Sequence, residues 1–424
     1  MRRAEATSYA PPWTHGGYAG RGVSAARRRR AKGLVVQVRD AVIVEALRSP
    51  IGRRNGSLKD VHPVDLSGEV LKGLIGKAGI DPGIVDDVIW GCVGQVGEQA
   101  FNIARWCWLS AGFPEDVPAT SVDRQCGSAQ QAIHFAAQGV MSGQYDVVVA
   151  GGVESMTRVP MGSSMNQGPG MPFGKNVMAR YPGLVPQGLS AEMIAEKWKI
   201  TREDVDTFSL ESHRRAIAAT DGGHFKREIV PIEVPTEDGG KRLFDTDECF
   251  RRETSAEKLA GLKPAFKEGG VVTAGNSSQI SDGAAAVIIM SEEKAKQLKL
   301  TPRARLHAFA LAAVDPVIML SGPIPATQKI LAKSGLTMND IDVTEINEAF
   351  ASVVLAWAKE LKPDMAKVNP NGGAVALGHP LGSTGARLCT TLLHELERTG
   401  GRYGLQTLCE GGGTANATII ERLG

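Results

Sequence analysis

The sequence lacks three features that mark common non-enzymatic classes of protein. Its six cysteines include no Cys-x-x-Cys pair and no His/Cys cluster, which argues against a disulfide scaffold or a zinc site and fits a reducing compartment such as the cytoplasm. No apolar stretch reaches the ~18 residues needed to cross a bilayer. The net charge is only +2, so charge gives no case for nucleic acid or an anionic membrane as the main partner.

Glycine is the residue that the chain has in excess. The 50 glycines among 424 residues predict many tight turns and close backbone approaches. A hydrophobic content of 42% and a charged content of 22% are typical of a globular enzyme. The length allows two or three domains with ample core.

Residues 1–39 differ in composition from the rest of the chain. They contain "RRRR" at 27–30, and Glu5 is their only acidic residue. This balance resembles a transit peptide, although the Pro-Pro and Gly-Gly pairs would interrupt an amphipathic helix, and a nucleic-acid-binding tail is an alternative. We expect a disordered extension, or an upstream start codon chosen in error, with the fold beginning near Asp40.

Strand and helix patterns alternate over residues 40–155. A buried strand is predicted at 41–46, an amphipathic helix at 64–79 that ends at Gly79, and a fully buried strand at 147–152. This alternation indicates an α/β protein with a mostly parallel sheet.

The same order of elements recurs in residues 291–424. The segment "KAGIDPGIVDD" at 77–87 aligns with "KSGLTMNDIDV" at 333–343, an offset of 256 residues. We therefore expect two copies of one α/β unit. Residues 156–290 interrupt the alternation and begin with a Met-, Gly- and Pro-rich stretch, so we expect them to form an inserted loop domain over the core.

Cys126 follows a short β-type run and precedes a long helical pattern. Free N–H groups and the helix dipole at a helix N-terminus favour a thiolate, so this position predicts a lowered cysteine pKa. The alternative is a buried, inert cysteine. The offset of 256 residues leads from Cys126 into "NPNGGAVALGHPLGSTGAR" (369–387), which contains His379. Pseudo-symmetric halves would thus bring a nucleophile and a base together at one edge of two packed sheets.

Two further segments have residues that could take part in catalysis. Cys409 ends a buried strand and enters the run Gly411–Gly413, whose backbone N–H groups could form an oxyanion hole; a core cysteine followed by a turn is the alternative. Asn347 lies between a strand and a helix, where it is either catalytic or a helix cap.

These segments resemble the thiolase family, the acetyl-CoA acetyltransferases and 3-ketoacyl-CoA thiolases. The resemblance runs from Asp40 to Gly424 and rests on "DRQCGS", "NEAF", "GGAVALGHPLGSTG", "CEGGG" and "VTAGNSSQISDGAAA". It implies a fold of two pseudo-symmetric α/β halves packed as five layers (αβαβα) with an inserted loop domain. The halves would be residues 40–155 and 291–424, and residues 156–290 would bind coenzyme A.

The resemblance also implies roles for individual residues. Cys126 would accept the acyl group, His379 would deprotonate the Cys126 thiol, and Cys409 would be the second acid/base. Asn347, holding a water, and His379 would form one oxyanion hole. The N–H groups of Cys126 and Gly411 would form the other.

Coenzyme A would be a substrate, with Ser278 at its pantetheine portion and Arg251 near its adenine nucleotide. No metal and no permanently bound cofactor are implied, and because members of the family are typically dimers or tetramers, the resemblance implies a homodimer or homotetramer. An exposed arginine beside Arg252 is often plain surface, which is the alternative for Arg251.

The implied reaction is cleavage of a 3-ketoacyl-CoA with coenzyme A to acetyl-CoA and a shortened acyl-CoA, or the reverse Claisen condensation. A ketoacyl synthase-type condensing enzyme and a non-catalytic lipid-binding relative are alternatives; the first lacks a second catalytic cysteine, and the second would be expected to lose the site residues. Glu410 and Gln279 depart from the family pattern. With these two residues the sequence resembles actinobacterial degradative thiolases, some of which act on bulky lipid or steroid side chains. The sequence leaves chain length, direction and assembly state open.

Overall fold

The computed structural model describes residues 39–424, so the expected basic extension lies outside the described residues except for Arg39. In this part of the chain one hydrogen-bonded sheet contains two groups of strands joined at β1 and β9. The first group runs in the order β4 (Ala119–Val122), β3 (Asp87–Gly91), β5 (Val147–Ser155), β8 (Ser281–Ser291), β1 (Ala41–Arg48). The second runs β9 (Ala304–Ala313), β12 (Thr414–Arg422), β11 (Tyr403–Glu410), β10 (Val343–Ile346). The short β2 (Gly52–Arg53) pairs with β8.

The two groups have the same internal pairing. β3 runs parallel to β5 and β8 returns antiparallel to β5, just as β10 runs parallel to β11 and β12 returns antiparallel to β11. β1 and β9 meet through only two residue pairs, Val42 with Arg305 and Ile43 with Ala304. The expectation of a mostly parallel sheet was wrong, because the last strand of each half turns back along its neighbour.

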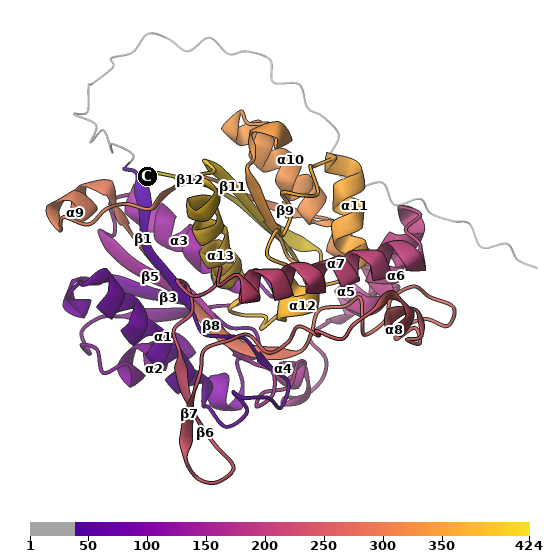
Figure 1. The fold of residues 1–424 in the computed structure, drawn as a ribbon, viewed down its shortest axis with the longest axis horizontal. Coiled ribbons are helices and arrows are strands. Elements are labelled where there is room, and N and C mark those ends of the chain that lie inside the picture. Colours follow the sequence, from indigo (N-terminus) through magenta and orange to yellow (C-terminus); the bar gives the residue numbers. More distant parts are fainter. Residues whose placement is uncertain (1–38) are drawn as a thin grey trace, which may run out of the picture. The chain divides into compact units, whose positions relative to one another are not determined.

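The helices complete five layers, and Figure 1 shows one helix layer between the two groups of strands and one on the far side of each group. The central pair is α3 (Ser128–Met141) and α13 (Thr384–Thr399), whose apolar side chains share one core cluster with strands of both groups. α1 (Pro63–Ala78) and α2 (Ile103–Ser110) cover the outer face of the first group, whereas α10 (Pro323–Ser334) and α11 (Ala351–Leu361) cover that of the second. The predicted five-layer α/β architecture is confirmed.

α1 shows how local sequence sets the ends of these helices. The His62 side chain caps the first turn by accepting from Val64 N at 3.2 Å, and Pro63 occupies the first helical position, where no N–H is needed. Gly79 ends the helix in a left-handed conformation with φ of 67°. The helix predicted over 64–79, with its end at Gly79, is confirmed.

The repeat inferred from the sequence extends over whole elements. The starts of α3 and α13, of β3 and β10, and of β5 and β11 are each 256 residues apart. The halves differ mainly in the connection to their last strand. That connection is the three-residue turn 411–413 in the second half, but 125 residues, 156–280, in the first half.

The regular elements of the inserted segment are helices and one hairpin. Its elements are α4 (Ser163–Asn166), α5 (Lys175–Arg180), α6 (Gln187–Lys197), α7 (Arg202–Asp221), β6 (Ile232–Pro235), β7 (Lys241–Phe244) and α8 (Ala256–Ala260). The expected boundary at 290 was too late, because β8 from Ser281 onward is a fully buried strand between β1 and β5. Two short helices, α9 (Glu292–Gln297) and α12 (Ala374–Leu377), lie in the second half. No helix in residues 39–424 has both the length and the apolar character to cross a bilayer.

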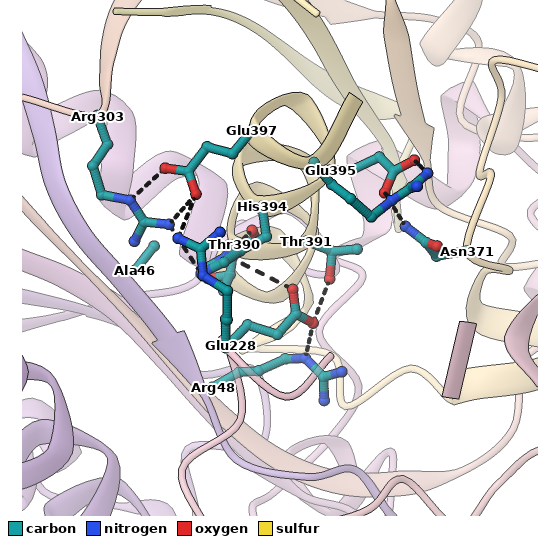
Figure 2. Close-up of polar contacts among 12 residues, drawn as sticks. Ala46, Arg48, Glu228, Arg303, Asn371, Thr390, Thr391, His394, Glu395 and Glu397 are labelled. Carbon is teal, nitrogen blue, oxygen red and sulfur yellow. Dashed lines mark hydrogen bonds and ion pairs between the residues drawn. The ribbon is translucent and has the colours of Figure 1, made fainter. Parts of the chain in front are cut away.

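A buried cluster of charged side chains joins the two halves and the insertion, and Figure 2 shows its Arg48 and Glu228 together with Thr391. Arg48 on β1 donates to Glu228 at 2.6 Å and to Asp247 at 2.7 and 2.9 Å, both from the inserted segment. Thr391 on α13 donates to the same Glu228 at 3.0 Å. Arg48, Glu228 and Asp247 are each no more than 3% exposed, so the cluster depends on internal pairing.

Candidate active site

Cys126 lies in a tight turn between β4 and α3. The preceding Gln125 has a φ of 48°, in the left-handed region that non-glycine residues rarely adopt. Asp123 Oδ1 accepts from Gln125 N at 2.7 Å. Ser128 Oγ accepts from Arg124 N at 2.9 Å and donates to Gln125 O at 2.6 Å. The surrounding hydrogen bonds therefore hold a strained backbone that presents Cys126.

The environment of Cys126 favours the neutral thiol. Cys126 is only 4% exposed, and burial together with the charge of Glu410 raises the pKa of its thiol to about 12. The expected lowering of this pKa was wrong, because α3 begins two residues later and desolvation outweighs the helix terminus. The side chain of Gln187 acts in the opposite direction by hydrogen bonding to Cys126.

His379 is held as a neutral imidazole with a defined tautomer. Its Nδ1 lies 2.6 Å from Thr384 Oγ1, and that hydroxyl donates to Pro380 O at 2.8 Å. The hydroxyl oxygen must then accept from Nδ1–H, which leaves Nε2 without a proton. Burial, together with the charge of Arg387, lowers the pKa of His379 to about 3. Nε2 therefore carries no proton and can act as a base.

Asn347 lies directly beside this nitrogen. Its Nδ2 is 3.2 Å from His379 Nε2, and its backbone N–H donates to Thr407 O at 3.1 Å. Its Oδ1 is buried and has no hydrogen-bond partner among the described residues. Asn347 is not a helix cap, since the N-cap of α11 is Phe350. The side chain is thus positioned by the fold and keeps a free polar atom.

Cys409 and Gly411 lie next to the turn that carries Cys126. Cys409 is fully buried at the end of β11, and burial, with the nearby Cys126, raises the pKa of its thiol well above the ordinary value. A Cβ on Gly411 would be 3.2 Å from Gln125 Oε1 and 3.4 Å from Gln187 Nε2. Gly411 therefore faces two neighbours of Cys126.

The contact between α3 and α13 links the residues around Cys126 with those around His379. A Cβ on Gly385 would lie 2.2 Å from Gln130 N, so the helices touch backbone to backbone near their first turns. Cys126 precedes one helix and His379 precedes the other. The pseudo-symmetric arrangement predicted for these residues thus places both in the region where the two helices begin.

A cleft of about 520 Å³ is lined mainly by residues of the inserted segment. Arg251 lines it, and so do Gln279, Val375 and His213, whose Nδ1 accepts from Arg251 N at 3.1 Å. Ser278 directly precedes Gln279, and its N–H donates to Ala349 O at 2.9 Å. The two residues expected at coenzyme A therefore lie at or next to one cleft.

Sequence reasoning missed three residues that support this site. Glu348 accepts from Ser212 Oγ, Asn369 Nδ2 and Val375 N at 2.7, 2.9 and 3.1 Å, and so ties the Asn347 loop to the glycine-rich block. The position of Glu348 in "NEAF" and that of Thr384 in the glycine-rich block could have identified these two residues from the sequence. No sequence motif points to Gln187, since it comes from the inserted segment. Among residues 39–424 no group of three His, Cys, Asp or Glu side chains could hold a metal ion.

Comparison with known families agrees with this geometry. Residues 41–293 match the model of the thiolase N-terminal domain, and residues 300–422 match that of the thiolase C-terminal domain. The chain belongs to the thiolase family. It is an acyltransferase of the acetyl-CoA acetyltransferase and 3-ketoacyl-CoA thiolase type.

Relatives of this thiolase cover nearly all of the described residues. The steroid 3-ketoacyl-CoA thiolase FadA6 of Mycobacterium tuberculosis is 55% identical, over 91% of this chain and 94% of the relative. A 3-ketoacyl-CoA thiolase of Photobacterium profundum is 47% identical, over 91% of this chain and 100% of its own length. The crystal structure of the Bacillus anthracis acetyl-CoA acetyltransferase matches with a TM-score of 0.84 at 44% identity, over 91% of this chain and all of that one. The Mycobacterium tuberculosis relative agrees with the degradative, actinobacterial-like branch that the sequence indicated.

Proposed function

We propose that this thiolase cleaves 3-ketoacyl-CoA with coenzyme A through an acyl group carried on Cys126, and that the reverse condensation uses the same residues. The observation that supports this assignment is the proximity of two buried thiols, Cys126 and Cys409, in a fold that also holds His379 as a neutral imidazole with an unprotonated Nε2. Cleaving a carbon–carbon bond requires a nucleophile and a separate proton donor for the departing carbanion.

In the first half-reaction His379 Nε2 takes the proton of Cys126. The thiolate attacks the ketone carbon, and collapse of the resulting alkoxide breaks the bond between the α- and β-carbons. The departing acetyl-CoA carbanion takes a proton from Cys409. This leaves an acyl-Cys126, a protonated His379 and a Cys409 thiolate.

In the second half-reaction coenzyme A restores each group. Its thiol gives a proton to the Cys409 thiolate, and the coenzyme A thiolate attacks the acyl carbon. Cys126 leaves as a thiolate and recovers its proton from His379. The cycle consumes one coenzyme A and returns every residue to its starting protonation state.

Two sets of donors would stabilise the oxyanions. Protonated His379 and the Asn347 side chain, with a water on it, would face the thioester oxygen of the departing acetyl-CoA, where the enolate charge develops. The N–H groups of Cys126 and Gly411 would face the ketone oxygen, which becomes the alkoxide and then the oxygen of the acyl-cysteine. Arg251 and Ser278, at the 520 Å³ cleft, would contact coenzyme A.

Substitution of the two cysteines separates the steps. Cys126→Ala should abolish both acyl-enzyme formation, measured by mass spectrometry with acetyl-CoA, and thiolysis of acetoacetyl-CoA. Cys409→Ala should still form acetyl-Cys126, because coenzyme A can leave as a thiolate, but should lose thiolysis, because the acetyl-CoA carbanion then has no proton donor. Full activity of Cys126→Ala would refute the assignment, and equal loss of both steps in Cys409→Ala would refute the role of that residue. Cys389→Ala, at a buried cysteine on α13, is the matched control.

The name of the Mycobacterium tuberculosis relative makes a bulky, steroid-derived acyl group the first to compare with linear ones. Thiolysis rates for short, long and branched 3-ketoacyl-CoA substrates would decide between them. A synthase-type condensing enzyme is less favoured because it would not need Cys409.

Assembly into a homodimer or homotetramer remains part of this proposal. β4 is an edge strand with β3 as its neighbour, and the nearby Phe101 is 84% exposed while it stacks on Trp106. Light scattering of the purified chain would give the assembly state.

The six free, buried cysteines suit the reducing cytoplasm.

A further inference from the structure

Glu410 is a buried carboxylic acid next to both thiols. It ends β11 directly after Cys409, and it is fully buried. Thr414, its cross-strand partner beyond the turn 411–413, donates a hydroxyl hydrogen bond to Oε2. Oε1 is buried and has no hydrogen-bond partner among the described residues.

The unpartnered oxygen points at the nucleophile turn. A Cβ on Gly127 would lie 2.0 Å from Glu410 Oε1, so the carboxyl group fills the space that a side chain would take at the residue after Cys126. The nearby charged groups are Arg124, which favours the ionised carboxylate, and Asp123, which opposes it. Asn416, the other close neighbour of Gly127, is neutral and donates to Gly127 O at 3.0 Å.

The charge on this carboxyl group acts on both sulfur atoms. An ionised Glu410 raises the pKa of Cys126 and that of Cys409. Burial raises the pKa of Glu410 itself to about 7, within the range in which an enzyme is assayed. Both half-reactions described above pass through a thiolate, first at Cys126 and then at Cys409. A negative charge near both sulfur atoms opposes each step.

We propose that Glu410 is a positioning residue whose protonation state sets the reactivity of Cys126 and Cys409: the neutral acid allows their thiolates to form, and the carboxylate suppresses them. The inference rests on the proposed function, since it assigns to this residue the upper pH limit of the same acyl transfer. Glu410 itself exchanges no proton with the substrate.

Alkylation of Cys126 by iodoacetamide tests the proposal without any turnover. The rate, followed at the Cys126 peptide by mass spectrometry from pH 6 to 9, reports how readily the thiolate forms. The ratio of the rate in Glu410→Gln to that in the unsubstituted enzyme should be near 1 at pH 6 and should rise to about tenfold at pH 9, the effect of roughly one unit in the Cys126 pKa. A ratio that does not change with pH would overturn the proposal, because loss of packing alone has no reason to follow a titration.

Thr414→Val provides a second test that keeps the carboxyl group. Loss of the Thr414 hydrogen bond raises the pKa of Glu410, so the carboxylate forms at a higher pH. The alkylation ratio of this variant to the unsubstituted enzyme should exceed 1 only in a window above pH 7 and return toward 1 when both carboxyl groups are ionised. A ratio without this maximum would contradict the proposal even if Glu410→Gln does not fold.

Glu69→Gln, at an exposed carboxylate on α1, is the control and should give a ratio of 1 throughout. kcat/KM for acetoacetyl-CoA thiolysis should follow the same pH dependence as alkylation. If no 3-ketoacyl-CoA is cleaved while the alkylation ratio rises, the proposed function fails and the coupling of Glu410 to Cys126 stands. If thiolysis occurs and the ratio is flat, only the role of Glu410 fails.

Discussion

At the scale of single residues, burial decides which protons the active site holds before substrate arrives. It raises the pKa of Cys126 to about 12 and lowers that of His379 to about 3, so the pair rests as a thiol and a neutral imidazole. Transfer of the proton is therefore uphill in the free enzyme. Bound substrate, with its developing oxyanion facing the donors described above, must supply the stabilisation. Alkylation of the free enzyme should accordingly be slow at pH 7.

Thr384 determines which nitrogen of His379 acts as the base. Thr384→Val removes the acceptor for Nδ1–H, so the tautomer with a free Nε2 loses its preference. We expect kcat/KM for thiolysis to fall on the order of 10–100-fold, with little change in KM. Thr390→Val is the matched control, since Thr390 lies on the same helix and donates only to Ala386 O. Equal losses in the two variants would show that Thr384 has only a structural role.

Glu410 also makes stability depend on pH. Its pKa rises from the ordinary carboxyl value of 4.5 to about 7 on folding, so folding favours the protonated form. The stability that it contributes is fully present below pH 4.5 and is lost as the pH rises through 7. Glu410→Gln should therefore leave the free energy of unfolding similar at pH 4.5 and increase it by on the order of 1–3 kcal/mol at pH 8. Urea unfolding at both pH values measures this difference, and a gain at pH 4.5 alone would contradict the assignment.

The sequence identifies the reactive residues better than it predicts their ionisation. Cys126, His379 and Cys409 are found from glycine-rich segments and the 256-residue repeat, because covalent chemistry needs particular residue types. The pKa of Cys126 depends on tertiary burial and on Glu410, which is 284 residues away in the chain. Gln187 was missed for a similar reason: its segment folds back onto the site from the insertion.

At the scale of elements, the contact between α3 and α13 keeps the two halves of the site together. Gly385→Ala places a methyl group 2.2 Å from Gln130 N, a backbone atom that cannot move alone. We expect a loss of about 1–3 kcal/mol in unfolding free energy, as for overpacked cores, and a loss of activity from displaced helix starts. Gly76→Ala on α1 is the control, because its Cβ would meet nothing within 4 Å and alanine favours a helix. Unchanged stability of Gly385→Ala would show that the helices can separate without cost.

Element prediction succeeds where the pattern is local. The end of α1 at Gly79 and the buried strand β5 follow from residues within each segment. The sequence does not separate β8 from the insertion, because only its pairing with β1 and β5 shows that it belongs to the sheet. The antiparallel direction of the last strand in each half does not follow from the sequence either, since the direction of pairing is a property of the whole fold.

At the scale of the whole molecule, the cluster around Arg48 joins parts that the sequence separates widely. β1 belongs to the first half, Glu228 and Asp247 to the insertion, and Thr391 to the second half. Such a cluster contributes little beyond an apolar core of the same volume, but removing one member leaves the others charged and unpaired. Its effect on stability should therefore appear only when it is broken.

Arg48→Met tests this expectation. The substitution keeps an apolar side chain but leaves the buried carboxylates of Glu228 and Asp247 without their cation, so the free energy of unfolding should fall by about 3–5 kcal/mol. Adding Glu228→Gln and Asp247→Asn should restore part of the loss, because neutral amides no longer need a counter-charge. Arg214→Met, at an arginine that is 69% exposed and paired with Glu211, should change stability by less than about 1 kcal/mol. Urea unfolding of the four proteins measures these values, and a loss in Arg48→Met no larger than that in Arg214→Met would show that the cluster is not what joins the three parts.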